Sequence, residues 1–196
     1  YGQVTYQGVP IDSQEILLEP CDHIGNGWTC WLSSSLSTST QSGGYYQFTT
    51  SASLGNDQKY VVLFRNTTND SRFLAEWRSF SIYSYTAGQV LPGGDFDIAD
   101  MVLLSPSDTA NVGLPVTFQW QTRIGALSDV YMFELYKPND LSVDFTTPKL
   151  GYAGSYTLNT LPAGFATGVE YGWYVWLFGP SDSIGYTNQY HRITFH

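Results

Sequence analysis

Short segments in which apolar and polar residues alternate recur along the whole chain, and they constrain its fold more than any other feature. No window instead repeats apolar residues at i, i+3, i+4 and i+7 over three turns, so we expect little helix. Turn sequences such as GNG, SGG, LGND, PGGD and KPND separate the segments, which is typical of β-sandwiches. The sequence therefore predicts an all-β protein. The alternating segments include Val4 and Tyr6; Ile16 and Leu18; Tyr60, Val62 and Phe64; Val116, Phe118 and Trp120; and Tyr131, Phe133 and Leu135.

A boundary between two domains is indicated at residues 103–115, LLSPSDTANVGLP. A strand-like segment ends there in Ser105-Pro106, and polar turn residues precede a new alternating run. A division near Ser105 gives two parts of about a hundred residues each, which is a normal size for one sandwich. We therefore expect two tandem β-sandwich domains, residues 1–104 and 105–196.

The first half contains, in order, GQVTYQGVPIDSQEILL, GGYYQFTT, KYVVLFRN and FDIADMVL. With this order of strands and glycine turns, residues 2–104 resemble the carboxypeptidase regulatory-like domains, which have a transthyretin-like sandwich. Such domains occur in extracellular proteins as accessory or structural modules. The resemblance implies no catalytic residues.

The second half contains VTFQWQ, YMFELY and SYTLNTLPAGFATGVEYGWYVWLF. These segments resemble a fibronectin type III or similar immunoglobulin-like sandwich. The resemblance implies that Tyr171 is a corner tyrosine whose hydroxyl bonds to upstream backbone near Leu161. The link PAGFATGVE between them is several residues longer than is usual in that family.

The charge of the chain limits its partners. Eight Lys and Arg against 17 Asp and Glu give a formal net charge of -9, which opposes binding to nucleic acid or to anionic membranes. The longest apolar run, residues 171–178, is far below the roughly 20 residues of a membrane span. Strand-like sequence starts directly after Tyr1, which is typical of a processed N-terminus in an extracellular or cell-surface protein.

Both cysteines lie in CDHIGNGWTC, at Cys21 and Cys30. Their C-x8-C spacing matches neither a redox motif nor a zinc pair, and an even count in a secreted sandwich favours a disulfide. The turn residues between them allow the chain to reverse. We expect a hairpin stapled by this disulfide, with Trp28 held outside it.

The acidic stretch GGDFDIAD offers a weak calcium candidate at Asp95, Asp97 and Asp100, because Ca²⁺ needs several converging oxygen ligands. The solvent face of a half-buried strand around Phe96 and Ile98 explains the same pattern. The histidines lack zinc-ligand spacing, and no Gly-Xaa-Ser-Xaa-Gly elbow is present. We therefore expect no enzyme activity, no cofactor and no firm metal site.

Two polar segments are candidates for glycosylation. Two overlapping sequons in NTTNDS make Asn66 and Asn69 candidate N-glycan acceptors. Residues 33–42, SSSLSTSTQS, are either an O-glycosylated segment or a flexible loop. Glycans there would mark a face of the protein that stays in solvent.

The segment YGWYVWLFG predicts an unusual outer surface. If its alternate residues from Tyr171 onward face the core, the pleat directs the others outward, where an antiparallel sandwich is normally polar. The neighbouring strand contributes further outward side chains, and the resulting apolar patch would mark an interface. The alternative is that the first domain or residues 162–170 cover this face. The outward residues are Met132, Tyr136, Tyr174, Trp176 and Phe178.

Two functions fit these features. The first is a non-enzymatic extracellular structural protein whose copies assemble into a filament, pilus-like fibre or surface layer through sandwich faces or strand edges. The second is an extracellular adhesin or carbohydrate-binding module that stacks sugar rings on exposed aromatic side chains. Candidate platforms for the second function are Trp28, Trp31, Trp77, Tyr45 and Tyr46.

Overall fold

The computed structural model describes residues 1–124 and 128–196, and nearly all of its regular structure is β-strand. Within those ranges the helical elements are two short 3-10 turns, η1 (Leu32–Ser34) and η2 (Pro180–Asp182). The expectation of an all-β fold is therefore confirmed. In the same described ranges, no helix is long and apolar enough to cross a membrane.

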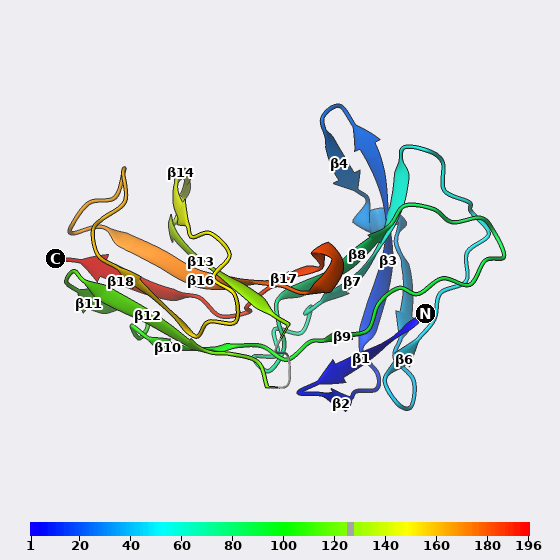
Figure 1. Cartoon of the computed structure of the whole chain (residues 1–196), viewed down its shortest axis with the longest axis horizontal. Helices are drawn as coiled ribbons and strands as arrows, with labels where there is room; N and C mark the ends of the chain where they lie inside the picture. Colours follow the sequence, from blue (N-terminus) through cyan, green and yellow to red (C-terminus); the bar gives the residue numbers. More distant parts are fainter. Residues whose placement is uncertain (125–127) are drawn as a thin grey trace.

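Two lobes lie side by side along the long axis of the molecule, with the chain ends in different lobes (Figure 1). The N-terminal lobe contains β1 (Gly2–Tyr6), β2 (Val9–Pro10), β3 (Glu15–Ile24), β4 (Gly27–Cys30), β5 (Leu36–Ser39), β6 (Tyr45–Tyr46), β7 (Gln58–Arg65), β8 (Glu76–Ile82) and β9 (Phe96–Asp97). The C-terminal lobe contains β10 (Val102–Ser105), β11 (Ala110–Val112), β12 (Val116–Gln121), β13 (Val130–Lys137), β14 (Asp140–Thr146), β15 (Ser155–Leu158), β16 (Glu170–Phe178), β17 (Ile184–Tyr186) and β18 (His191–Phe195).

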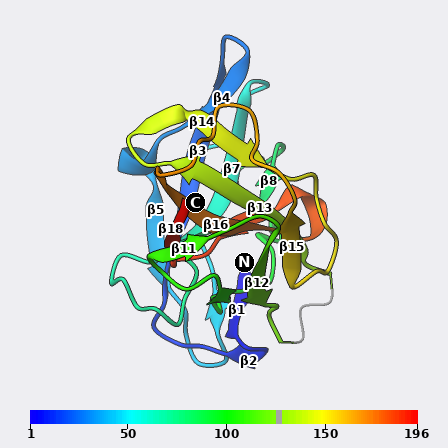
Figure 2. The same ribbon diagram turned by 90° about the vertical axis from the view of Figure 1, so that its left-hand side faces the viewer.

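Two sheets form the C-terminal lobe. β12 pairs with β10 and β15 in one sheet, while β11, β18, β16, β13 and β14 belong to the other. Phe118 of the first sheet packs between them, with its ring centroid 4.4 Å from Phe133 and 5.2 Å from Trp173. Figure 2 views this lobe from its outer end, with β13 and β14 on one side and β12 on the other. The aromatic residues of the alternating segments therefore build the core of this lobe.

Short strands cover the larger sheet in the N-terminal lobe. β1 pairs with β2, β6 and β9, and the core residues of this group pack against β3, β7 and β8. Trp77 of β8 stacks on Phe96 of β9 at 6.3 Å between centroids, and only 3% of Trp77 is exposed. The expectation that Trp77 is an exposed stacking platform is therefore wrong, because its ring is part of the core.

One sheet of 11 strands runs through both lobes. β17 pairs with β16 of its own lobe on one side and with β8 of the other lobe on its second side, where Tyr186 lies opposite Glu76. A single cluster of buried apolar residues also includes members from both lobes. The division into domains at 1–104 and 105–196 stays a prediction, and the lobes are joined across it by main-chain pairing.

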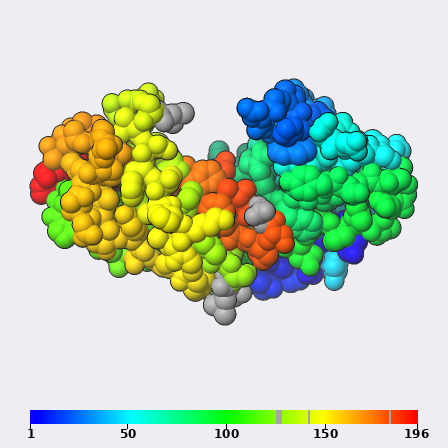
Figure 3. All heavy atoms as spheres, turned by 45° about the horizontal axis from the view of Figure 1, so that its top comes forward, coloured from blue at the N-terminus to red at the C-terminus, as the bar shows by residue number. Residues whose placement is uncertain are grey.

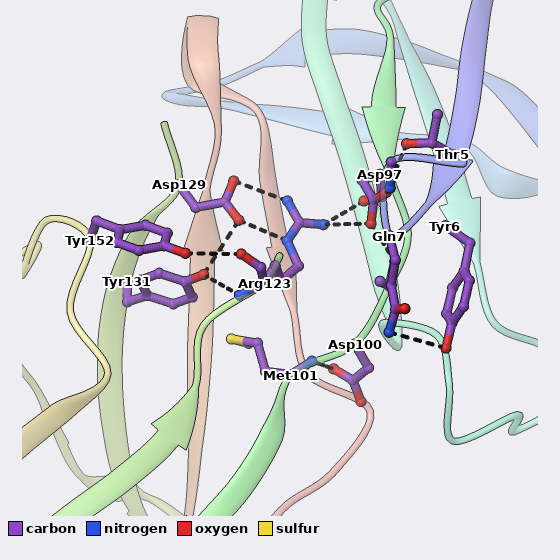
Figure 4. Close-up of polar contacts among 12 residues, drawn as sticks. Thr5, Tyr6, Gln7, Asp97, Asp100, Met101, Arg123, Asp129, Tyr131 and Tyr152 are labelled. Carbon is purple, nitrogen blue, oxygen red and sulfur yellow. Dashed lines mark hydrogen bonds and ion pairs between the residues drawn. The ribbon is translucent and has the colours of Figure 1, made fainter. Parts of the chain in front are cut away.

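Arg123 follows β12 and fixes the lobes to each other from inside (Figure 4). Its guanidinium donates to both carboxylate oxygens of Asp129, at 2.7 and 3.0 Å, and to the carbonyl of Asp97 in the N-terminal lobe. The same group lies 5.1 Å from the ring centroid of Trp77. Arg123 and Asp129 are almost completely buried, so this contact is part of the interior.

Tyr171 on β16 acts much as a corner tyrosine, with a different partner from the one expected. Its hydroxyl accepts a hydrogen bond from the backbone N–H of Ala166 at 2.8 Å and lies close to the carbonyl of the same residue. The expected contact near Leu161 is therefore wrong. The longer link explains this, because it folds back and places Phe165 against the Tyr171 ring at 4.6 Å.

Candidate functional site

The side chains of β13 and β16 alternate between the core and the outer face of the sheet, as the pattern predicts. Tyr131, Phe133 and Leu135 on β13 and Trp173, Val175 and Leu177 on β16 are completely buried. The outward residues between them are half-buried. We call the following outward residues the aromatic strip: Met132, Tyr136, Tyr174, Trp176, Phe178 and, from β17, Tyr186.

Four rings of the aromatic strip form a continuous row across three strands. The centroid distances are 5.6 Å from Tyr136 to Tyr174, 5.7 Å from Tyr174 to Trp176 and 5.2 Å from Trp176 to Tyr186. Tyr136 also lies directly over its cross-strand partner Gly172, where a Cβ atom would meet the ring at 2.5 Å. Glycine at this position lets the first ring of the row lie flat against the sheet.

Two charged residues border the aromatic strip. Trp176 donates its indole N–H to Glu134, the outward residue of β13 that lies between Met132 and Tyr136. Burial, followed by a hydrogen bond to Glu134, raises the pKa of Tyr174. Lys149 places its ammonium group 4.0 Å from the ring centroid of Phe178. The aromatic strip is therefore bordered by one acidic side chain, Glu134, which is held by a hydrogen bond, and by one basic side chain, Lys149.

The alternative that residues 162–170 cover this face does not fit the contacts. Phe165 and Ala166 from that segment pack on Tyr171, whose side chain points into the core. The segment therefore closes the end of the core. The N-terminal lobe continues the same sheet through β17 and β8.

An ionic network continues the outer face beyond Tyr186. Arg65 and Arg78 each bind Glu76 at 2.8 Å, and Arg78 also binds Glu19 at 2.9 Å. Both glutamates are buried, so the arginines are needed to balance their charge. Because two positive and two negative groups compensate each other, this part of the sheet has no net charge to attract a ligand.

The β3–β4 hairpin forms the far border of this face. A disulfide joins Cys21 and Cys30, which lie opposite each other in the hairpin, and this confirms the prediction from their spacing. Trp28 is 36% exposed and contacts His23 and Tyr83, with Lys59 4.6 Å from its ring centroid.

Trp31 follows the hairpin directly and is 41% exposed. Its indole donates to Asp22 at 2.7 Å. Both Trp28 and Trp31 are therefore accessible, while their rings contact neighbours in the hairpin, in β7 and directly after β8.

A hollow separates the two projecting hairpins on this side of the molecule. Figure 3 shows it between the β14 region and the β3–β4 hairpin, with residues of the β16–β17 region at its floor. The aromatic strip occupies the part of the sheet between β14 and β8. We therefore take this concave face as the candidate functional site.

The three aspartates of the calcium candidate do not form a common site. Asp95 accepts from the backbone of Gln3, and Asp97 accepts from Thr5, Gly8 and Ala99. Asp100 accepts from the backbone of Met101 and Asn188. Each carboxylate therefore accepts hydrogen bonds from a different set of backbone groups. In the described part of the chain, the one close group of metal-ligand types is Glu19 with Cys21 and Cys30, and the disulfide uses both thiols.

The two sequons differ in how free their amides are. The Asn66 amide donates to the carbonyls of Asp70 and Phe73, so its hydrogen bonds already stabilise the loop. Asn69 is exposed at the turn, with a φ of 54°. Asn69 is therefore the more accessible acceptor on the folded protein, and glycosylation itself stays a prediction.

Comparison with known proteins assigns no family. No protein-family model matches the chain, and no curated protein matches it significantly. The two domain resemblances therefore remain predictions, and function has to be argued from the surface itself.

Proposed function

We propose that the chain is a non-enzymatic extracellular structural protein whose copies assemble into a filament, pilus-like fibre or surface layer through the aromatic strip. The observation that carries this proposal is the row of rings from Tyr136 to Tyr186 on the outer face of an antiparallel sheet. Such a face is normally polar, and a contiguous apolar patch that stays partly exposed there indicates an interaction surface.

The chemistry of the aromatic strip suits a protein partner. Tyr and Trp dominate the energetic centres of interfaces because they bury a large area at little conformational cost and keep a polar tip. Trp176 lies at the centre of the strip, between Tyr174 and Tyr186, and its indole is fixed by Glu134. We expect Trp176 to be the main anchor.

The outer face of the sheet is better suited to assembly than its β14 edge. β14 is an edge strand whose described pairing is with β13, and it carries Asp140 and Asp144. Charged residues on an edge strand oppose the addition of another strand. A concave face must meet a different surface of the next copy, and such head-to-tail contacts continue as open filaments when their rotation does not close.

The disulfide supports the extracellular part of the proposal. Disulfides persist in oxidising compartments and are rare in the cytosol. The Cys21–Cys30 pair closes a hairpin next to the concave face, where it would keep one border of the contact surface in place outside the cell.

Sedimentation velocity and negative-stain microscopy of the native protein over a range of concentrations test the proposal. We expect higher-order species whose amount rises with salt, because copies with a net charge of -9 repel one another until that charge is screened. Replacement of Trp176 by Ala should raise the concentration needed for assembly at least about ten-fold. Trp31→Ala, which removes an exposed indole outside the strip, is the matched control.

A second variant alters the border of the aromatic strip, and circular dichroism separates a loss of contacts from a loss of folding. Lys149→Ala removes an exposed side chain over Phe178 and leaves the core untouched. Circular dichroism should show native structure in all three variants. The proposal fails if the native protein stays monomeric at the highest concentration and salt, or if Trp31→Ala weakens assembly as much as Trp176→Ala does.

A further inference from the structure

A separate cavity of about 790 Å³ opens in the N-terminal lobe, away from the aromatic strip. It is bounded by β6 and the extended residues after it, by β7 and β8, and by residues 85–93. Its size lies within the roughly 300–1,000 Å³ typical of small-molecule sites. Aromatic side chains form much of its wall, namely Tyr1, Tyr45, Tyr46, Phe48, Tyr60 and Tyr85.

The wall of this cavity contains no Asp, Glu, Lys or Arg side chain among the described residues, although the chain as a whole carries a net charge of -9. The one charged group of the described wall, the α-ammonium of Tyr1, already donates to the carbonyl of Leu91 at 3.3 Å and interacts with Asp95. A charged ligand placed inside would lose its hydration without gaining a free counter-ion, which is costly. The cavity therefore selects for a neutral ligand.

Hydrogen bonds hold several of the tyrosine rings in position. The hydroxyl of Tyr85 donates to the carbonyl of Thr50 at 2.7 Å, and that of Tyr46 donates to the carbonyl of Gly94 at the same distance. Tyr60 donates to the carbonyl of Ala52 at 3.3 Å. Because their hydroxyls are anchored, the half-buried rings of Tyr60 and Tyr85 present their accessible parts to the cavity without having to be ordered by a ligand. Tyr46 is only 2% exposed and belongs to the core, so the expectation that it is an exposed stacking platform is wrong.

Uncharged polar groups stand beside the rings. The wall includes the amides of Gln41, Gln47 and Gln89 and the hydroxyls of Thr49 and Thr50. The side chains of Gln41 and Gln47 are exposed, so their amides are open to a ligand that enters the cavity. Each amide can both donate and accept, which matches a ligand that carries hydroxyl groups.

We propose that this cavity binds a neutral oligosaccharide. A pyranose ring has an apolar C–H face that packs on aromatic rings, and its hydroxyls both donate and accept hydrogen bonds, as the glutamine amides do. The absence of charged side chains from the described wall, where the α-ammonium of Tyr1 already has partners, disfavours acidic and basic sugars as ligands. This inference goes beyond the proposed assembly and uses different residues.

An extended peptide that adds to residues 47–50 is the competing occupant. The observations favour the sugar, because Tyr85 already lies along the backbone to which a peptide would add. Its hydroxyl uses the carbonyl of Thr50, and its own carbonyl accepts from the backbone of Leu54. A new strand would have to displace these bonds, whereas a sugar can use the exposed amides beside them.

Isothermal titration calorimetry and saturation-transfer NMR on the native protein test the proposal with four probes: cellotetraose, maltotetraose, the tetramer of N-acetylglucosamine, and tetragalacturonate. We expect at least one neutral tetramer to bind, and tetragalacturonate to bind at least about ten-fold more weakly than it. Tyr45, which is 60% exposed, can be replaced by Ala with little effect on the fold. Tyr45→Ala should weaken binding several-fold, because one stacking surface for a sugar ring is lost.

Further variants make the outcome specific to the cavity. Tyr85→Ala should reduce affinity at least about ten-fold, while Tyr85→Phe, which keeps the ring, should retain most of it. Trp31→Ala and Trp176→Ala should bind as the native protein does, so a failure of assembly and a failure of sugar binding remain distinguishable. The proposal is overturned if none of the neutral tetramers binds, if Tyr45→Ala and Tyr85→Ala leave binding unchanged, or if a threonine- and valine-rich octapeptide binds this cavity in their place.

Discussion

Arg123 crosses from the C-terminal lobe into the N-terminal lobe, and its replacement by Met tests whether the junction is part of one cooperative interior. The change removes both hydrogen bonds to Asp129, the bond to the carbonyl of Asp97 and the contact with the Trp77 ring. Met keeps an apolar stem of similar length, so the loss is mainly electrostatic. Asp129, which is 3% exposed, is left buried without its partner.

The expected cost follows from that burial. Removing one member of a buried ion pair destabilises a protein by about 3–5 kcal/mol, because the remaining charge is uncompensated. With a denaturant slope of about 2 kcal/mol per molar urea, the midpoint of unfolding should fall by about 2 M. Replacement of Asp129 by Asn in the same chain removes the stranded charge, so Arg123→Met with Asp129→Asn should be more stable than Arg123→Met alone.

Urea unfolding followed by tryptophan fluorescence and by near-ultraviolet circular dichroism measures this effect. We expect a single transition by both probes, because β17 and β8 join the lobes in one sheet and tryptophans report from each lobe. Arg72→Met is the matched control, since Arg72 binds Asp70 at 2.7 Å on the exposed surface. We expect no measurable shift of its midpoint.

Three results would refute this reasoning. Equal midpoints for Arg123→Met and Arg72→Met would mean that burial at the junction adds nothing to the pair. Two separate transitions in the native protein would mean that the lobes unfold independently despite their shared sheet. A double variant less stable than Arg123→Met would mean that the unpaired charge of Asp129 is not the source of the loss.

Two further predictions concern the hairpin and pH. Replacing Cys21 and Cys30 by Ser should lower the free energy of unfolding by about 2–3 kcal/mol, because the ring of about 10 residues is no longer closed in the unfolded chain; an unchanged urea midpoint would contradict this. Burial raises the pKa of Asp100 from 3.8 to about 7, so the folded state binds its proton more tightly between those values. Stability should therefore fall as pH rises through that window, by about 3 kcal/mol between pH 5 and 8 relative to Asp100→Asn, and a constant difference between the two proteins over that range would argue against it.

Local patterns were enough to predict the strands, the hairpin disulfide and the direction of the side chains in the aromatic strip. Successive side chains of a strand point to opposite faces, so the spacing of Trp173 and Trp176 places one ring in the core and the other outside. The sequon and calcium candidates were less informative, because a polar side chain in a loop is often used by that loop. Asp95, which accepts a hydrogen bond from the backbone of Gln3, and Asn66, which donates to the carbonyl of Asp70, are examples.

Residues on or beside the aromatic strip that were not predicted had a weak signal in the sequence. Glu134 has the same parity on its strand as Met132 and Tyr136, so its outward direction could have been inferred. Its hydrogen bond to Trp176 could not, because that contact depends on the register between β13 and β16. Tyr186 of the strip and Lys149 beside it come from other segments, and their positions could not be inferred for the same reason.

The sequence by itself determined the all-β class and which face each strand turns inward, because both depend on neighbours a few positions apart. The tertiary structure alone decided the pairing of Tyr186 with Glu76, the burial of Trp77 and the reach of Arg123 into the other lobe. Each of these joins segments far apart in the chain, where alternation allows many pairings. Only the packing of the whole core selects one pairing, because a shifted pairing would expose buried rings or leave a buried charge without its partner.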